Sequence, residues 1–285
     1  MSKKYYGVIG HPIGHTLSPF IHTRLMALSG IDGEYGVYDI DINELDKKFA
    51  DTLSKLNGLN VTIPHKQAIM RLLDETDETA KLYGSVNTVA FVQNDNGSTC
   101  SKGYTTDGIG FVTALENAGM SFGSTATVIG CGGVGRVFAN TCAVRNCKVN
   151  LLVRESAFER TELFAESLNK RFGEGTAKVF FIGKFEGESD LLINASPVGM
   201  YPKTDYCPVS EDIISKSKSV FDAVYNPADT MLVKKARDMG IKAISGMTML
   251  VYQAAAAQTI WNGSVFSSED IDKLAEDCFK ELNNR

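Results

Sequence analysis

The chain has 285 residues, of which 44% are hydrophobic and 22% are charged, a composition typical of a globular protein with room for two domains. Its formal net charge is −5, whereas a general nucleic-acid-binding protein is usually basic, so we expect no nucleic-acid partner. No apolar stretch reaches the roughly 18 residues that a membrane span needs, and the first ten residues lack the apolar core of a signal peptide. We therefore expect a cytoplasmic protein with no membrane partner.

The first third of the chain alternates between strand and helix patterns, which predicts a sheet with some parallel strands. The predicted strands are residues 5–10, 33–41, 58–63, 86–93 and 98–104, and the last two are expected to form a hairpin around the Asp95-Asn96-Gly97 turn. The predicted helices are residues 18–30, 42–56 and 66–75, the first with Ser18 as its N-cap and Pro19 at its first position.

A second unit is predicted after Asp107, and the α/β alternation continues through it to a helical tail. The predicted strands are residues 125–130, 148–155, 177–182, 190–196, 219–226 and 242–246. The predicted helices are residues 108–119, 137–146, 159–173, 230–240, 248–263 and 267–282.

A glycine-rich loop follows the first predicted strand of this second unit. The run Gly130-Cys131-Gly132-Gly133-Val134-Gly135 matches the G-x-G-x-x-G pattern, and a helix is predicted directly after it. In such a loop the glycines allow a tight turn, close approach of backbone to a pyrophosphate, and close packing of helix on strand. A structural glycine turn is the alternative, but the strand–loop–helix context favours dinucleotide binding.

The end of the next predicted strand gives a mixed signal about which dinucleotide is bound. An acidic residue there would bind the ribose 2′-hydroxyl of NAD, and an arginine would accommodate the 2′-phosphate of NADP. The chain has both, in Val153-Arg154-Glu155. Arg154 favours NADP, and Glu155 favours NAD if its side chain points towards the cofactor rather than to solvent.

Lys66 stands where a lysine is unexpected, in the first turn of a predicted helix that follows Pro64. The N-terminus of a helix disfavours a cation, so a lysine placed there suits general acid/base chemistry. An ordinary surface lysine is the simpler interpretation when this stretch is taken alone. Asp107 adds weight, because it lies at the predicted domain junction and could pair with Lys66 and orient a substrate hydroxyl. Its alternative role is that of a helix N-cap.

Short hydroxyl and amide side chains recur along the chain, as the lining of a polyhydroxylated ligand would require. Taken one at a time, each is more often a cap, a turn or a satisfied core group. As candidates for substrate binding the sequence offers Thr16, Ser18, Asn60, Thr62, Asn87, Tyr225 and Gln253. The six cysteines have neither C-x-x-C spacing nor a nearby histidine, so we expect reduced thiols and no metal site.

Eight segments, in this order, closely resemble the shikimate dehydrogenase family along nearly the whole chain. They are HPIGHTLSP, NVTIPHK, YGSVNTV, GYTTDGIG, GCGGVG, NASPVGM, DAVYNP and GMTMLVYQAA. The resemblance implies an NADP-dependent oxidoreductase that reversibly reduces 3-dehydroshikimate to shikimate, on the chorismate route to aromatic amino acids. It also implies two α/β domains: a substrate-binding domain at residues 1–107, completed by helices within 248–285, and a Rossmann dinucleotide-binding domain at residues 108–247.

The resemblance further implies roles for individual residues. Lys66 and Asp107 correspond to the catalytic pair, in which Lys66 takes a ring hydroxyl proton in the oxidative direction and Asp107 orients the lysine. Thr16 and Ser18 correspond to the positions that hold the substrate carboxylate, and Thr62, Asn87, Asp107 and Gln253 to ligands of the ring hydroxyls, with Tyr225 nearby. The glycine loop would bind the pyrophosphate. The residues implied near the nicotinamide are Asn194, Ser196, Pro197, Gly246 and Met249.

The chain departs from the family's usual pattern in four places. Thr16 replaces a serine, Thr105 an asparagine and Ser196 a threonine, and Val153-Arg154-Glu155 stands where Asn-Arg-Thr is usual. The methyl group of Thr16 narrows the carboxylate end of the site, so a quinate/shikimate dehydrogenase that uses NAD is the nearest alternative. A sensor that binds cofactor and cyclitol acid without turnover, and an unrelated dehydrogenase that shares only the Rossmann half, are further alternatives. Either a monomer or a homodimer fits the sequence.

Overall fold

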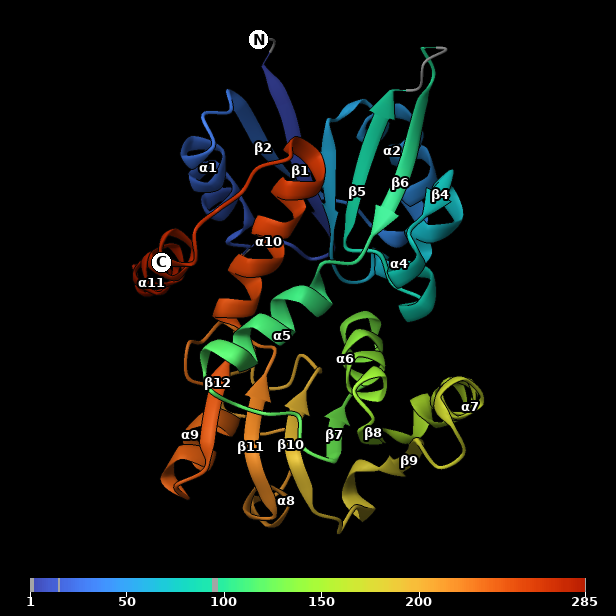
Figure 1. Cartoon of the computed structure of the whole chain (residues 1–285), viewed down its shortest axis with the longest axis vertical. Coiled ribbons are helices and arrows are strands. Elements are labelled where there is room, and N and C mark those ends of the chain that lie inside the picture. The colour runs from blue at the N-terminus through green and yellow to red at the C-terminus, as the bar shows by residue number, and fades with distance from the viewer. Residues whose placement is uncertain (1–2, 15, 94–96, 285) are drawn as a thin grey trace. The chain divides into compact units, whose positions relative to one another are not determined.

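The computed structural model describes residues 3–14, 16–93 and 97–284, and the chain folds into two compact α/β units (Figure 1). Unit 1 comprises Met1–Gly110 and Val251–Arg285, and unit 2 comprises Phe111–Leu250. The chain passes into unit 2 within helix α5 (Asp107–Asn117) and leaves it within helix α10 (Met247–Asn262). The domain limits expected from the sequence fall at the first residues of these two helices and stay a prediction.

The centre of unit 1 is a sheet of six strands, β1 (Lys4–Gly10), β2 (Gly33–Asp39), β3 (Gly58–Val61), β4 (Glu75–Thr76), β5 (Thr88–Gln93) and β6 (Thr99–Tyr104). Their order across the sheet is β2-β1-β3-β5-β6-β4. β1 pairs in parallel with β2 and with β3, whereas β5 pairs antiparallel with β3 and with β6. The predicted pairing of β5 with β6 is confirmed, and Asp95 and Asn96 of its predicted turn lie outside the described residues.

Helices α1 (Ser18–Leu28), α2 (Leu45–Asp51), α3 (His65–Ala68), α4 (Glu78–Tyr83) and α11 (Ser268–Asn283) belong to unit 1 together with most of α10. Apolar side chains of β1, β3, β5 and α2 form a buried core, among them Ile9, Leu45, Leu59 and Val89. Among the described residues, no helix combines the length and the apolar character that crossing a membrane requires.

The helix predicted from Lys66 to Glu75 is wrong in its length. α3 has only four residues and continues as a 3₁₀ turn over Ile69–Leu72. The backbone carbonyl of Lys66 accepts a hydrogen bond from Val86 N over 2.9 Å, so it is engaged away from the helical ladder, and Leu73 is extended. A helix this short has a weak dipole, so the argument that the dipole disfavours the charge of Lys66 is weak. The low exposure of the Lys66 side chain is the stronger reason to expect an acid/base role.

Three other local predictions differ from the structure. The N-cap of α1 is Leu17 and not Ser18, which is the first helical residue. The helix predicted over 42–56 is divided into a 3₁₀ turn, α2 and a second 3₁₀ turn, and α2 ends because Thr52 leaves the helical region, with φ −131° and ψ −53°. The short β4 and α4 were not expected. They occupy the segment between α3 and β5, where no hydrophobic pattern is long enough to predict a helix or a strand.

Unit 2 has a fully parallel sheet of six strands, β7 (Thr125–Ile129), β8 (Lys148–Val153), β9 (Ala177–Phe181), β10 (Ser189–Asn194), β11 (Ser217–Asp222) and β12 (Lys242–Ser245). Their order is β12-β11-β10-β7-β8-β9, with every neighbouring pair parallel. The first strand therefore lies in the middle, and the chain winds outward from it in both directions, which is the doubly wound arrangement of dinucleotide-binding folds.

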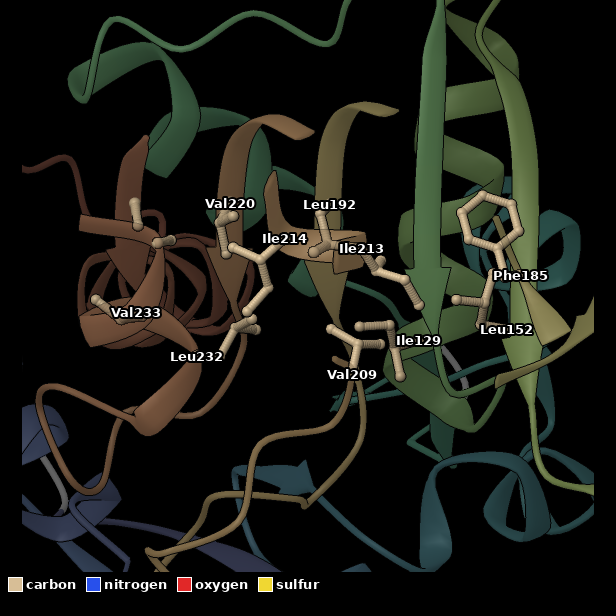
Figure 2. Close-up of a cluster of buried hydrophobic side chains, with 12 residues drawn as sticks. Ile129, Leu152, Phe185, Leu192, Val209, Ile213, Ile214, Val220, Leu232 and Val233 are labelled. Atoms are coloured by element: carbon tan, nitrogen blue, oxygen red, sulfur yellow. The ribbon is translucent and has the colours of Figure 1, made fainter. Parts of the chain in front are cut away.

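Helices α6 (Gly133–Val144), α7 (Phe158–Phe172), α8 (Glu211–Ser215) and α9 (Met231–Asp238) complete unit 2. Figure 2 shows one of its cores, in which Ile129, Leu152, Leu192 and Val220 of four neighbouring strands lie close to side chains of α8 and α9. This packing fixes the strands laterally, so that the ends of β7, β8, β10 and β11, which carry the site residues of this unit, are held at one edge of the sheet.

Candidate active site

An ion pair in unit 1 joins Lys66, which is partly buried, to Asp107, which is buried. Lys66 lies in α3, shortly after the end of β3, and Asp107 is the first residue of α5. Lys66 Nζ donates a hydrogen bond to Asp107 Oδ2 over 2.5 Å, and the two side chains are 12% and 6% exposed. An ammonium has three N–H groups, so Lys66 can bind a ligand hydroxyl while it stays bonded to Asp107. The structure thus brings together the two residues expected to act as a pair.

Asn87 holds the second oxygen of Asp107. Its Nδ2 atom donates to Asp107 Oδ1 over 2.8 Å, and its Oδ1 atom accepts the backbone N–H of Thr106 over 2.7 Å. Asn87 and Asp107 are 2% and 4% exposed. Since one carboxylate oxygen binds Lys66 and the other binds Asn87, the plane of the Asp107 carboxylate is fixed from both sides.

Gln253 of α10 joins the same network from the C-terminal part of unit 1. Its Oε1 atom accepts from Asn87 Nδ2 over 3.2 Å and from Thr106 Oγ1 over 3.4 Å. Thr106 was not predicted, although it precedes Asp107 within the quoted segment GYTTDGIG. Its hydroxyl also lies 2.9 Å from Asn87 Nδ2, so it supports Asn87 and does not merely connect β6 to α5.

Asn60 supports Asn87 from β3 with all of its polar atoms bonded inside the protein. Its Oδ1 atom accepts from the Tyr35 hydroxyl over 2.6 Å, and its Nδ2 atom donates to Asn87 O and to Thr88 Oγ1. It is 6% exposed. This geometry favours a positioning role, and the predicted contact of Asn60 with substrate stays a prediction.

Tyr35 is in turn held by a stack of aromatic rings. The imidazole of His22 lies parallel to the Tyr35 ring, with 4.3 Å between centroids and 6° between planes, and Trp261 lies 5.3 Å from His22 on a tilt. Nδ1 of His22 is 3.0 Å from Nε2 of Gln258, an amide donor that requires an unprotonated acceptor. Burial lowers the pKa of His22 to about 3, so this histidine is neutral in the folded protein.

Unit 1 is expected to lose stability when the pH falls below the ordinary pKa of histidine. The unfolded chain binds a proton on His22 near pH 6.5 and the folded chain only near pH 3, so the unfolded state gains protons first. The loss between pH 7 and pH 5 is roughly 2 kcal/mol. Urea unfolding of the wild type and of His22→Phe at both pH values measures it, followed by the fluorescence of Trp261, the single tryptophan.

The unfolding free energy of the wild type should fall relative to that of His22→Phe as the pH falls, because phenylalanine does not titrate. The other groups of the protein titrate alike in both chains, so their effect cancels in the difference. A difference in unfolding free energy that is the same at pH 7 and at pH 5 would contradict the assignment of His22 as the acid-labile group.

The other candidates for substrate binding in unit 1 lie near strand ends. The Thr16 hydroxyl donates to Ser18 Oγ over 3.0 Å and accepts the backbone N–H of Ser18 over 3.1 Å, so the two hydroxyls are neighbours at the start of α1. Thr62 follows the last residue of β3, where its backbone N–H bonds to Ile9 O over 2.9 Å. The three side chains are partly buried, which leaves them accessible to a small ligand.

The glycine loop of unit 2 has the geometry that each glycine was expected to provide. Gly130 has φ +90°, a conformation that other residues rarely adopt. A Cβ atom on Gly135 would lie 2.2 Å from the carbonyl oxygen of Gly130, so helix and loop approach as closely as backbone permits. A Cβ atom on Gly132 would meet nothing within 4 Å. Gly132 therefore faces open space at the N-terminus of α6.

The carboxyl ends of β10 and β11 carry a buried polar cluster. Asn194 Nδ2 donates to Asp222 Oδ1 over 2.9 Å, and the Thr230 hydroxyl donates to Asp222 Oδ2 over 2.7 Å. Asn194 Oδ1 accepts the backbone N–H and the hydroxyl of Ser196. Burial raises the pKa of Asp222 to about 6. Asp222 and Thr230 were missed, although Asp222 opens the DAVYNP segment at the end of a predicted strand.

The remaining residues implied near the nicotinamide lie in the same unit. A Cβ atom on Gly246 would lie 2.3 Å from the carbonyl oxygen of Ala223, and Gly246 N donates to Val224 O over 3.1 Å. Gly246 thus lets the end of β12 contact the segment that leads to Tyr225. Met249 follows in α10 and is 6% exposed, and the carbonyl of Pro197 accepts from Met200 N in the turn after β10.

Arg154 and Glu155 line one pocket. It has a volume of about 460 Å³ and is formed by residues 153–155, which start at the last residue of β8, and residues 181–184, which start at the last residue of β9. Glu155 therefore lies beside Arg154 in this pocket, and the mixed signal of the sequence is also present in the structure. Lys184, which the sequence analysis did not single out, belongs to the same pocket.

All six cysteines are free thiols. Within the described ranges, no three side chains of histidine, cysteine, aspartate or glutamate are grouped so that they could hold a metal ion.

Comparison with known proteins identifies the family. The family described as the shikimate dehydrogenase substrate binding domain matches residues 8–89. A curated shikimate dehydrogenase (NADP(+)) of Caldanaerobacter subterraneus is 35% identical over 273 residues, which cover 94% of this chain and 95% of that protein. A shikimate dehydrogenase solved in complex with NADP⁺ is 32% identical with a TM-score of 0.86, covering 97% of this chain and 96% of that one.

A second solved structure, shikimate 5-dehydrogenase of Listeria monocytogenes in complex with shikimate and NAD, is 30% identical with a TM-score of 0.83 and covers 97% of this chain and 96% of that one. These alignments extend over nearly the full length of both partners and include both units. The chain belongs to the shikimate dehydrogenase family.

Proposed function

We propose that this protein catalyses the reversible NADP-linked reduction of 3-dehydroshikimate to shikimate. The main support for the proposal is the ion pair of Lys66 and Asp107, in which Lys66 Nζ lies 2.5 Å from Asp107 Oδ2 and Asn87 donates to Asp107 Oδ1. An oxidoreductase that acts on a hydroxyl needs a group in a fixed position that can donate and accept a proton. The curated relative named for NADP(+) and the solved relative bound to NADP⁺ support the cofactor. We assign substrate recognition to unit 1 and cofactor binding to unit 2.

The residues of unit 2 fit a dinucleotide. Open space over Gly132 at the start of the twelve-residue helix α6 allows a pyrophosphate to approach the backbone. Arg154 beside its pocket suits the adenosine end, and Asn194 with Ser196 suits the nicotinamide end. When bound, the cofactor would supply a hydride as NADPH in the reducing direction and accept one as NADP⁺ in the oxidising direction.

Lys66 donates and accepts the proton of this reaction. In the reducing direction its ammonium donates a hydrogen bond and then a proton to the carbonyl oxygen of the substrate, which becomes the hydroxyl. In the oxidising direction the neutral amine takes that proton back. Asp107 keeps the lysine Nζ in position and stabilises its positive charge, and the Asn87 amide keeps the carboxylate from rotating. The polar groups are already placed before the reaction starts, which lowers the reorganisation cost.

Recognition of the substrate follows from the remaining polar groups of unit 1. The neighbouring hydroxyls of Thr16 and Ser18 can donate to a carboxylate, and Thr62, Asn87 and Gln253 supply donors and acceptors for ring hydroxyls. The methyl group of Thr16 restricts the space beside the carboxylate. This residue therefore bears on the choice between shikimate and quinate, which the rate measurements decide.

A quinate/shikimate dehydrogenase that uses NAD is the second candidate, because Glu155 lines the pocket beside Arg154 and the Listeria relative was solved with NAD. A binding protein without turnover is a third, and the retained Lys66–Asp107 pair argues against it. The three differ in rate and in substrate, so one set of rate measurements separates them.

We expect shikimate with NADP⁺ to give the highest kcat/KM among the four combinations of shikimate or quinate with NADP⁺ or NAD⁺, by tenfold or more, or about 1.4 kcal/mol. The near-ultraviolet absorbance of the reduced nicotinamide reports each rate. A comparable rate with NAD⁺ or with quinate would favour the second candidate. No turnover in any of the four, from a protein that binds the cofactor, would favour the third.

A further inference from the structure

The pocket beside Arg154 is bounded on its second side by the end of a neighbouring strand. β8 and β9 are parallel and pair Val153 with Phe181, so residues that follow the two strands emerge side by side at the same edge of the sheet. Arg154 is the first residue after β8, and Lys184 lies three positions after the end of β9. Both line the pocket of about 460 Å³.

The charge of this pocket is unbalanced. It contains the two cations Arg154 and Lys184 and one carboxylate, that of Glu155. Some other lysines of unit 2 have acidic partners, as Lys216 has Asp212 and Lys235 has Glu211, both at 2.7 Å. Across the described part of the chain, neither Arg154 nor Lys184 takes part in an ion pair. The pocket can therefore accept an anion without first breaking an internal salt bridge.

Aromatic rings give Lys184 a defined location. Its Nζ atom lies over the Phe181 ring, 5.4 Å from the centroid, a separation at which an ammonium is attracted to the ring face. Phe181 is itself stacked on Phe158, with 4.3 Å between centroids and 22° between planes. The lysine thus rests on a packed aromatic pair and not on a freely moving strand end.

The glycine loop places this pocket at the adenosine end of a bound dinucleotide. Gly130 N donates to Leu152 O over 2.9 Å, so the loop starts directly beside the last residues of β8. With the pyrophosphate at the loop, the adenosine ribose lies over the end of β8, where the choice between NAD and NADP is made. A group reaching from the next strand, β9, meets the ribose 2′ position from the side opposite to the loop.

We propose that Lys184 binds the 2′-phosphate of NADP together with Arg154 and thereby determines the preference for NADP. This rests on the proposed function, and it explains how the chain tolerates Glu155. A 2′-phosphate carries close to two negative charges near neutral pH, which one arginine beside a carboxylate does not balance. The second cation restores a net positive pocket. The 2′-hydroxyl of NAD has no charge and gains little from Lys184.

The test is the substitution Lys184→Gln, which removes the charge and keeps most of the side chain. Loss of one charge-assisted contact at a partly exposed site is expected to raise the KM for NADP⁺ about tenfold. The KM for NAD⁺ and the kcat with shikimate should stay within about twofold of the wild-type values, since the lysine lies away from the reacting atoms. Lys178→Gln is the matched control, because Lys178 is an exposed lysine of β9 that lies outside the pocket.

A binding measurement separates this inference from the proposed function. Calorimetric titration with adenosine 2′,5′-bisphosphate and with AMP requires no turnover, and we expect Lys184→Gln to weaken the bisphosphate about tenfold and to leave AMP unchanged. Bisphosphate affinity unchanged in Lys184→Gln, or lowered equally in Lys178→Gln, would overturn the role of Lys184. A wild type that prefers the bisphosphate through Lys184 but does not oxidise shikimate would overturn the proposed function alone.

Discussion

Replacing Lys66 by alanine is expected to lower kcat for shikimate oxidation about 10²- to 10⁴-fold, the usual contribution of a positioned acid/base group, with little change in KM. The lysine lowers the barrier of the proton-transfer step, so its loss lowers kcat. The neighbouring hydroxyl and amide groups continue to bind the substrate, so KM changes little. Steady-state rates of the wild type and of the variant over a range of shikimate concentrations, with NADP⁺ saturating, separate the two constants.

Loss of Lys66 also leaves the Asp107 carboxylate buried without its cation, which costs of the order of 3 kcal/mol. Lys66→Gln is therefore a necessary second variant, because its amide can still donate to Asp107 but cannot accept a proton. Lys81→Ala, at an exposed lysine of α4, is the control for loss of a charge in the same unit. If Lys66→Gln folds normally, keeps kcat and raises KM strongly, Lys66 is a binding residue and the proposed mechanism is wrong.

Asp107 supplies a second test of the same pair. Since each residue acts through the other, Lys66→Gln and Asp107→Asn should not be additive: the double variant is expected to be nearly as active as the slower single variant. Additive losses would indicate two groups that act independently on the substrate.

Most of the fold could be predicted from the sequence because strands and helices alternate with clear signals. In unit 2 every predicted strand is present, and the glycine loop follows β7 as expected. The error in the length of α3 has a long-range cause. α3 ends early because the backbone N–H of Val86, twenty residues away, donates a hydrogen bond to the carbonyl of Lys66. A contact between segments that are distant in sequence leaves no periodic pattern in either segment, so it could not be predicted.

The site was harder to predict than the fold for a related reason. The pairing of Lys66 with Asp107 could be predicted from their chemical types. The sequence did not show which of the asparagine side chains would hold Asp107. Asn60 and Asn87 are the same residue type near adjacent strands and both are hydrogen-bonded within the protein, but only Asn87 binds the Asp107 carboxylate. Asp222 was missed because an aspartate at a strand end is common, and only its burial against Asn194 and Thr230 distinguishes it.

Alanine at Gly132 and at Gly135 should produce different kinds of defect, although the two glycines are three residues apart in one motif, the first at the N-cap of α6 and the second within the helix. A Cβ atom on Gly132 would enter open space, and its backbone, with φ −81° and ψ −163°, is accessible to alanine. We expect Gly132→Ala to fold normally but to hold the pyrophosphate away from the backbone, which raises the KM for NADP⁺ about tenfold to a hundredfold.

Gly135→Ala is expected to destabilise unit 2 by about 3 kcal/mol or more, because its Cβ atom would lie 2.2 Å from the Gly130 carbonyl oxygen, a backbone atom that cannot move aside without shifting β7. Thermal unfolding of both variants, followed by KM values for NADP⁺ and for shikimate at a temperature where both are folded, distinguishes the two effects. An unchanged KM for NADP⁺ in a stable Gly132→Ala would mean that the cofactor does not lie against this loop. A fully stable Gly135→Ala would mean that α6 can move away from β7. In that case the close packing of helix on strand does not determine the position of the loop, and the third glycine of the motif has another reason to be there.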